Sequence, residues 1–149
     1  MPVLVDTNIL LRVLDREDPL HESARSAVRA IKSRGEQNVT TLQNVAEFWN
    51  VCTRPVYARG GLGLTVEQAE KRLRMLERIF TVLPDLPGLY QCWRQLVVSR
   101  RVLGVQVHDA KLVAAMTLHG ITQILTLNER DFSRYPGITV LAPDKLIGR

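Results

Sequence analysis

The sequence predicts an α/β fold: one domain over residues 1–149, with a central, mainly parallel, twisted sheet of four to five short strands flanked by helices. Short apolar segments alternate with longer stretches in which apolar residues recur every three or four positions, a pattern typical of strand–helix units. The 149 residues are enough for one hydrophobic core. No repeat or Pro/Gly/Ser-rich linker divides the chain, so we expect a single domain.

The chain opens with the apolar stretch PVLVD, residues 2–6, which we expect to be a strand followed by an apolar helix over 8–14. Asp18-Pro19 predicts the start of a second helix, because Asp is a preferred N-cap and proline fits the first helical position. Gly35 is typical of its end.

A second strand is expected over 37–41, followed by a helix that ends at Thr53-Arg54-Pro55. Apolar residues spaced i, i+3, i+4 and i+7 form the buried face of that helix: Val45, Phe48, Trp49 and Cys52. The stretch RPVYARGGLG, residues 54–63, has the glycines and proline of a surface loop.

Thr65-x-x-Gln68 is a capping-box pattern and predicts the start of the next helix. The apolar stripe of that helix is Val66, Ala69, Leu73, Leu76 and Phe80. A third strand is expected over 81–83, and Pro87 is expected to open a helix that reaches about Arg101.

The final third of the chain predicts an alanine-rich helix that begins at Asp109 and is closed by Gly120. A strand over 123–127 leads to a turn or short helix over 128–132, and a last strand is expected over 138–141.

The composition favours an anionic partner, since the net charge is +5 and the pI is near 9.7. Arginine far outnumbers lysine, and the arginine fork matches phosphate oxygens. No apolar run approaches the roughly 18 residues that cross a bilayer, and MPVLVD lacks the features of a signal peptide. We therefore expect a cytoplasmic protein with no membrane association. Cys52 and Cys92 belong to no C-x-x-C pair, which argues against zinc and redox chemistry.

Four acids recur where strands end or helices begin. Asp6 ends the first strand, Glu47 lies beside the apolar face of its helix, Asp109 begins a helix, and Asp131 follows the strand before the last. Each also has an ordinary explanation: an N-cap for Asp6 and Asp109, solvent exposure for Glu47 and turn chemistry for Asp131. Functional sites nevertheless gather beyond the carboxyl ends of parallel strands, where these residues would meet.

Four converging carboxylates would repel one another by several kcal/mol in a partly buried cleft. A divalent cation would remove that repulsion and keep them ionised. Oxygen ligands without cysteine or a histidine pair favour Mg²⁺ or Mn²⁺ over zinc, and such ions suit phosphoryl chemistry. An acidic centre on a basic protein is typical of a metal-dependent nuclease.

The motifs also carry a family resemblance that spans nearly the whole chain. They are VLVDTNILL at 3–11, NVAEFWNVCTRP at 44–55, GLGLT at 61–65, HDAKLVAAM at 108–116 and ILTLNERDFSRY at 124–135. In this order and spacing the chain resembles the PIN-domain family, and specifically the VapC-type ribonuclease toxins of bacterial type II toxin–antitoxin pairs. The resemblance implies a PIN-like domain.

The resemblance assigns metal-binding and catalytic roles to Asp6, Glu47 and Asp109. The family's last acidic element, T-x-[DN]-x-x-D-F, corresponds to Thr126, Asn128, Asp131 and Phe132. Its first acidic slot is an asparagine here, so the fourth charge is assigned to Asp131. Residues expected to orient the carboxylates or the attacking water are Thr7, Asn8, Asn44, Thr126 and Asn128.

The implied activity is hydrolysis of RNA phosphodiester bonds by water activated by Mg²⁺ or Mn²⁺. The implied partners are an RNA substrate, a cognate antitoxin and a second copy of the chain in a homodimer. Candidates for phosphate contacts, each equally explained as solvated surface charge, are Arg54, Arg59, Arg100, Arg101 and Arg130.

One alternative stays open, namely a non-catalytic PIN-like module that binds RNA or protein. Other hydrolase classes lack their motifs. An aspartyl-nucleophile phosphatase needs an acid at position 8, where this chain has Asn8, and the sequence contains neither a P-loop nor a G-x-S-x-G elbow.

Overall fold

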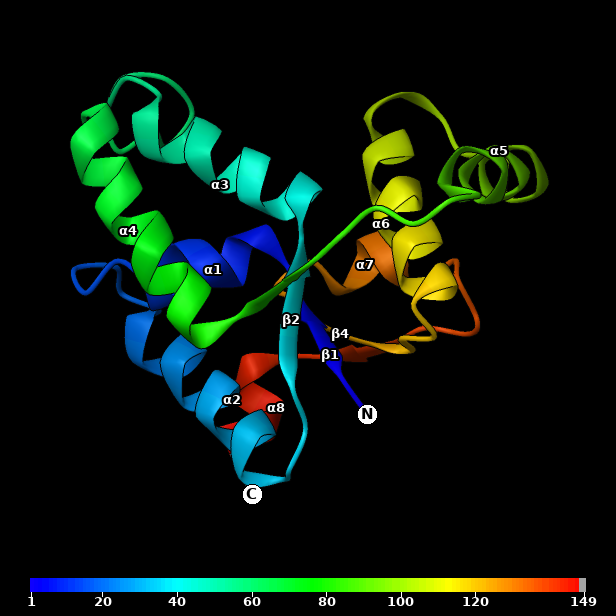
Figure 1. Ribbon diagram of the computed structural model, residues 1–149, viewed down its shortest axis with the longest axis horizontal. Coiled ribbons are helices and arrows are strands. Elements are labelled where there is room, and N and C mark those ends of the chain that lie inside the picture. Colours follow the sequence, from blue (N-terminus) through cyan, green and yellow to red (C-terminus); the bar gives the residue numbers. More distant parts are fainter. Residues whose placement is uncertain (148–149) are drawn as a thin grey trace.

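The computed structural model describes residues 1–147, so Gly148 and Arg149 of the expected domain lie outside the described residues. The α/β prediction is confirmed: helices flank a sheet of five parallel strands (Figure 1). The order of the strands across the sheet is β3-β2-β1-β4-β5. They are β1 Val3–Val5, β2 Asn38–Thr41, β3 Thr81–Leu83, β4 Gln123–Leu125 and β5 Thr139–Leu141.

Every strand pair is parallel, so all carboxyl ends meet at one edge with β1 in the middle. The chain leaves β1 for α1 at that edge, beside the point where β4 ends. The order of the strands therefore places Asp6 at the centre of the edge where ligand sites of such sheets form.

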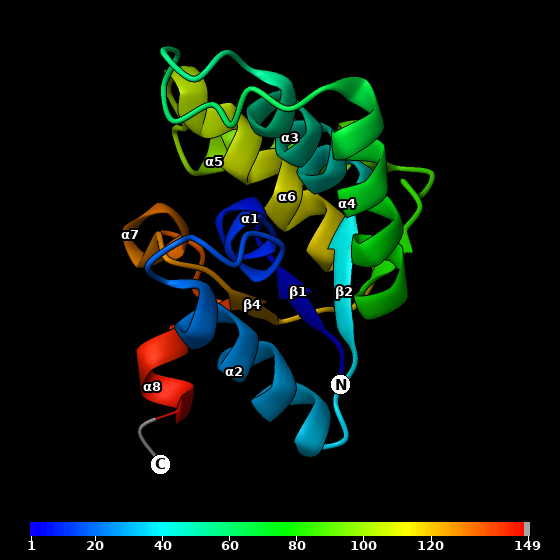
Figure 2. The same ribbon diagram turned by 90° about the vertical axis from the view of Figure 1, so that its left-hand side faces the viewer.

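The helices form two groups, one on each side of the sheet (Figures 1 and 2). One group comprises α1 Thr7–Val13, α2 His21–Ser33, α3 Leu42–Thr53, α4 Val66–Ile79 and α8 Pro143–Ile147. The other comprises α5 Leu89–Ser99, α6 Val107–Leu118 and α7 Glu129–Phe132, with a 3-10 turn at Gly104–Gln106 before α6.

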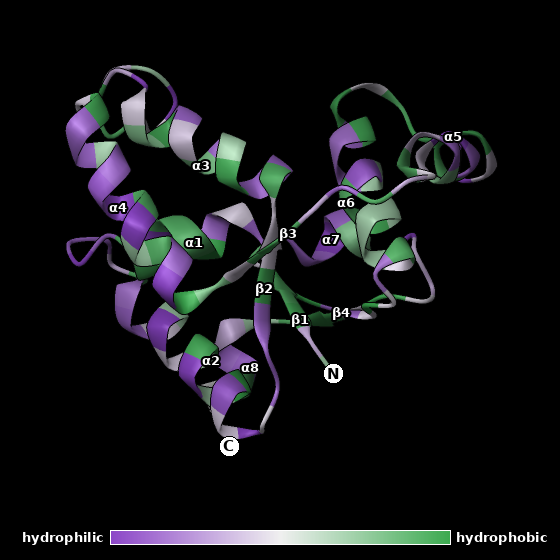
Figure 3. Ribbon diagram, viewed as in Figure 1, coloured by the Kyte–Doolittle hydropathy of each residue, from purple (hydrophilic) through white to green (hydrophobic). Residues whose placement is uncertain are grey.

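Alternating residues of β1 separate two hydrophobic cores. Val3 and Val5 pack with the group that contains α1 to α4, whereas Leu4 packs with the group that contains α6. Both faces of the strand are therefore buried, which explains its uninterrupted apolar sequence. The strand is green along its length in the hydropathy view (Figure 3).

Several predicted element boundaries are confirmed. Thr65 and Gln68 form the expected capping box at the start of α4. Gly35 and Gly120 follow α2 and α6 with φ of 79° and 69°, a left-handed conformation that favours glycine.

Three expected helix starts were wrong, and one helix was not anticipated. The helix expected to open at Pro87 begins at Leu89, because Gly88, in a left-handed conformation with φ of 91°, is its N-cap. The helix expected from Pro19 begins at His21, because Asp18 accepts a hydrogen bond from the Leu20 amide (2.8 Å) and caps the preceding turn instead. The helix expected to begin at Asp109 begins at Val107, because the 3-10 turn runs directly into it. Helix α8 was not anticipated, since five residues are too few to show a helical period.

Among the helices of residues 1–147, none is both long and apolar enough to cross a membrane.

Candidate active site

Asp6 is held by hydrogen bonds to both of its carboxylate oxygens. Its Oδ1 accepts from the Thr7 amide (2.8 Å), so Asp6 does cap α1, and also from Asn44 Nδ2 (3.3 Å). Its Oδ2 accepts from Thr126 Oγ1 (2.8 Å) and Asn8 Nδ2 (3.5 Å). These donors come from α1, α3 and the end of β4, so three separate segments of the chain fix one side chain.

The pKa of Asp6 is raised above its ordinary value, chiefly because the side chain is removed from water. The hydrogen bonds from Thr126 and Thr7 oppose that shift, while the charges of Glu47 and Asp131 add to it. The capping role alone does not explain such crowding, because a simple N-cap needs no acidic neighbours.

Glu47 approaches from α3. Its Oε2 accepts a hydrogen bond from Thr7 Oγ1 (2.9 Å), and its Oε1 accepts one from Gln43 Nε2 (3.3 Å). Thr7 therefore joins the first helix to the second acid. Gln43 was not anticipated from the sequence, although its i, i+4 spacing to Glu47 is a signal for such a contact.

Asp109 lies in the first turn of α6, and its pKa is raised to about 6. Burial is the largest cause, followed by the charges of Asp131, Asp6 and Glu47, while Arg134 acts in the opposite direction. All four predicted acids are therefore close enough for their charges to affect one another, although they lie up to 125 residues apart in sequence.

The buried polar side chains expected beside the acids are Thr7, Asn44 and Thr126. Thr126 also accepts hydrogen bonds from Asn8 Nδ2 (3.3 Å) and from the Asn128 amide (3.0 Å). Asn128 joins this network through its backbone; within residues 1–147 its side chain makes no hydrogen bond.

The family model of the PIN domain matches residues 3–138, which is most of the chain. The chain belongs to the PIN-domain family. It is 29% identical to ribonuclease VapC48 of Mycobacterium tuberculosis over 145 residues, covering 93% of this chain and 94% of that protein.

Solved structures with the same fold include two toxin–antitoxin complexes. VapBC2 from Rickettsia felis has a TM-score of 0.72 at 12% identity, covering 95% of this chain and 98% of that one. A toxin–antitoxin complex from Klebsiella pneumoniae has a TM-score of 0.63 at 23% identity, covering 95% and 97%. At these identities the likeness shows the PIN fold of this chain.

The donor set of this PIN domain fits a hard divalent cation in its chemistry. Burial is the main cause of the raised pKa values of Asp6 and Asp109, and the charges of the neighbouring acids add to it. A bound cation would offset both effects. Within residues 1–147, however, no three His, Cys, Asp or Glu side chains are arranged to hold an ion. The acids are neighbours rather than a closed ligand set, as expected for carboxylates that repel one another.

The predicted arginines divide into different regions. Arg130 is exposed in α7, next to Asp131. Arg54 and Arg59 follow the far end of α3, where Arg54 donates a hydrogen bond to the Arg59 carbonyl (3.1 Å). Arg100 and Arg101 follow α5. Arg134 was not selected from the sequence, yet its charge reaches Asp109.

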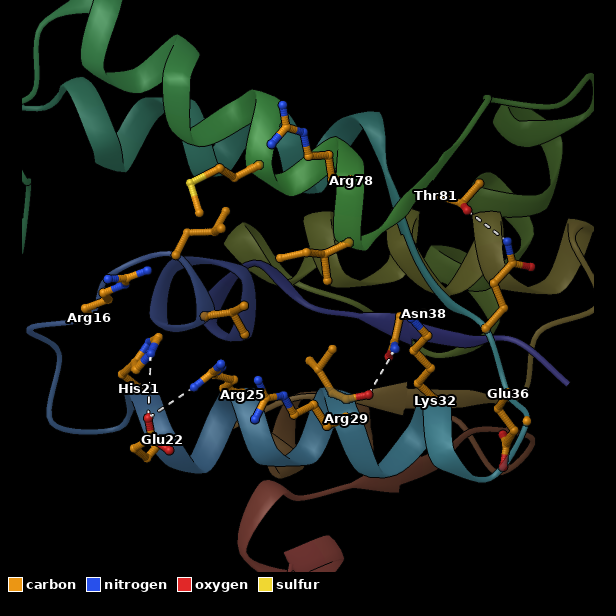
Figure 4. A pocket seen from close by; sticks show the side chains of 17 residues that line it. Arg16, His21, Glu22, Arg25, Arg29, Lys32, Glu36, Asn38, Arg78 and Thr81 are labelled. Carbon is orange, nitrogen blue, oxygen red and sulfur yellow. Dashed lines mark hydrogen bonds and ion pairs between the residues drawn. The ribbon is translucent and has the colours of Figure 1, made fainter.

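A separate groove of about 1110 Å³ lies between α2 and α4 (Figure 4). Its apolar lining includes Val13, Leu14, Val28, Met75 and Ile79. The cations along it are Arg16, Arg25, Arg29, Lys32 and Arg78. In the part of the chain that the structure describes, Arg25 forms an ion pair with Glu22 (3.7 Å), and the other four form none. Two acids, Glu22 and Glu36, also line the groove, so it is apolar in part and its cations outnumber its acids.

Proposed function

We propose that this chain is a metal-dependent endoribonuclease that hydrolyses RNA phosphodiester bonds and acts as the toxin of a toxin–antitoxin pair. The observation that carries the proposal is the hydrogen-bonded placement of Asp6 and Glu47 by Thr7, Asn44 and Thr126. The pKa of Asp109 is raised mainly by burial and further by the charges of Asp131, Asp6 and Glu47. Membership of the PIN-domain family and the likeness to ribonuclease VapC48 support the activity. The net charge of +5 suits a polyanionic substrate.

Asp6, Glu47, Asp109 and Asp131 are the residues that would hold Mg²⁺ or Mn²⁺. When bound there, such an ion would supply a positive charge that polarises the phosphate and lowers the pKa of the attacking water. The chain's own donors keep the ligands in place: Thr126 and Asn44 orient Asp6, and Thr7 orients Glu47. Arg130 and Arg134 are the arginines best placed in the sequence around Asp131 to contact the phosphate.

The experiment is a cleavage assay on purified protein with a mixed cellular RNA pool. We expect cleavage with Mg²⁺ or Mn²⁺, none with EDTA, and recovery when Mn²⁺ is added back in excess. Sequencing the 5′ ends of the fragments identifies the RNA and the cleavage site. RNA binding without cleavage under all three conditions would support the non-catalytic alternative instead.

The basic groove is the place we propose for the cognate antitoxin, through a segment with acidic side chains and an apolar face. Charge complementarity favours such an occupant over a basic or neutral one. Helix α1 leads from the acids to the groove, since Asp6 caps its start and Val13 ends it. The groove is also lined by Asn38 and Thr81, which begin β2 and β3, so it lies toward the edge of the sheet opposite the acids. Toxin–antitoxin assemblies of the same fold exist.

The homodimer and the cytoplasmic location stay predictions. Light scattering on the purified chain measures its mass in solution and so tests the homodimer. We expect about twice the chain mass of 16.9 kDa.

A further inference from the structure

Glu47 and Asp109 stand on helices that belong to different hydrophobic cores. On α3, Phe48 and Cys52 pack in the core that contains Val3 and Val5. On α6, Ala110 and Leu112 pack in the core that contains Leu4. The sheet lies between the two cores, and Figure 1 shows α3 and α6 on its two sides. Apolar packing alone therefore does not fix the separation of the two acids.

Gln43 connects these two helices at the site. Its Nε2 donates to Glu47 Oε1 (3.3 Å) and to the His108 carbonyl (2.8 Å), next to Asp109. An amide nitrogen carries two hydrogens, one for each acceptor. Because a carboxylate and a carbonyl only accept, the nitrogen rather than the oxygen of the Gln43 amide must face them. Across residues 1–147 this is the one side-chain hydrogen bond between α3 and α6.

The two hydrogen bonds of Gln43 extend a hydrogen-bond network that begins at Asp6. Asn44 Nδ2 donates to Asp6 Oδ1 (3.3 Å) and to Thr7 Oγ1 (3.1 Å). Thr7 Oγ1 donates to Glu47 Oε2 (2.9 Å). With Gln43 in place, hydrogen bonds therefore run without interruption from the end of β1, through α3, to the start of α6.

We propose that Gln43 is a positioning residue that joins the two halves of the site and holds Glu47 at a set distance from Asp109. It touches neither substrate nor ion in this role. The inference depends on the metal-dependent function proposed above, and it adds a residue outside the expected set. Without the two hydrogen bonds of Gln43, the position of Glu47 on α3 is no longer tied to that of Asp109 on α6. A shared ion would then be bound less tightly, and the reacting groups would be aligned less well.

The test variant is Gln43→Met, which keeps the length and the helix propensity of the side chain but removes both donors. The matched control is Gln95→Met on α5, where the glutamine is exposed and makes no side-chain hydrogen bond within the described chain. Calorimetric titration with Mn²⁺ should give a dissociation constant about tenfold higher for Gln43→Met. We expect kcat to fall about tenfold while KM for RNA stays within about twofold.

The metal-free melting temperature separates positioning from folding. We expect it to change by less than about 2 °C in both variants, because Gln43 is not in either core. A Mn²⁺ dissociation constant equal to that of the unmodified chain would overturn the inference, whatever happens to the melting temperature. If the unmodified chain cleaves no RNA, the proposed function fails, but the Mn²⁺ comparison still decides the role of Gln43.

Discussion

Replacing Asp109 by asparagine is expected to abolish RNA cleavage and, without metal, to make the protein more stable at neutral pH. A metal ligand contributes several kcal/mol to transition-state stabilisation, and about 4 kcal/mol corresponds to a loss of roughly 10³-fold in rate. Removing a carboxylate usually weakens a helix start. At Asp109, burial and the acidic neighbours raise the pKa to about 6, so the ionised carboxylate is unfavourable in the folded protein. Replacing it with the neutral asparagine should therefore stabilise the fold.

The sign of the pH dependence follows from that pKa. The folded state holds the Asp109 proton up to about pH 6, whereas the unfolded chain releases it near 3.8. Metal-free protein should therefore lose stability as the pH rises from about 4 to 6, and the loss is complete above the folded-state pKa. Since the side chain is partly exposed, we expect on the order of 1 kcal/mol, or about 3 °C in melting temperature.

Thermal unfolding in EDTA at pH 4 and pH 7.5 measures this effect. Asp109→Asn should match the unmodified chain at pH 4 and exceed it at pH 7.5. The control Asp85→Asn, in an exposed segment before α5, should change neither stability nor cleavage. Retained cleavage, or lower stability at pH 7.5, would remove Asp109 from the proposed site.

Reversing two charges in the groove is expected to separate the toxin from its antitoxin while leaving the nuclease intact. Arg25 and Arg29 line the groove from exposed positions on α2, outside the buried stripe that contains Ala24, Ala27 and Val28. Arg25→Glu with Arg29→Glu should therefore keep the fold. Against an acidic segment, we expect the dissociation constant to rise about 100-fold, with a larger effect at low salt.

The probe is the cognate antitoxin, to be sought as the product of a small reading frame beside this gene and then co-expressed and purified with the chain. The matched control is Lys71→Glu with Arg94→Glu, which changes the net charge equally at exposed positions outside the groove. The groove variant should lose the partner and retain RNA cleavage, while the control keeps both. If both variants bind the antitoxin equally weakly, the net charge of the protein and not the groove determines binding.

The strands and most helices follow from local patterns, because both faces of β1 are buried and α4 carries its own capping box. The strand order does not follow from them, since nothing in the apolar sequence of β1 specifies its neighbours β2 and β4. The helix start at Val107 was missed because the preceding 3-10 turn has no distinctive sequence.

The sequence predicted the four acids and their convergence, whereas the hydrogen bonds that hold them and the extent of their burial became apparent only in the fold. Asp109 resembles an ordinary helix-start residue until Asp131, Asp6 and Glu47 lie near it. The groove had no sequence signal, because its cations are four separate arginines and Lys32, which lie on α2, on α4 and in the loop before α2. Gln43 had a weak signal, its spacing to Glu47, whereas its contact with the His108 carbonyl joins residues 65 positions apart.

Whether Asp6, Glu47, Asp109 and Asp131 share a dication is tested most directly by anomalous X-ray diffraction from crystals of this chain grown with Mn²⁺. We predict a manganese peak at coordination distance from oxygens of Asp6 and Asp109, with Glu47 and Asp131 around it, directly or through water. Manganese bound elsewhere, with these four carboxylates free of it at saturating concentration, would contradict a shared metal site.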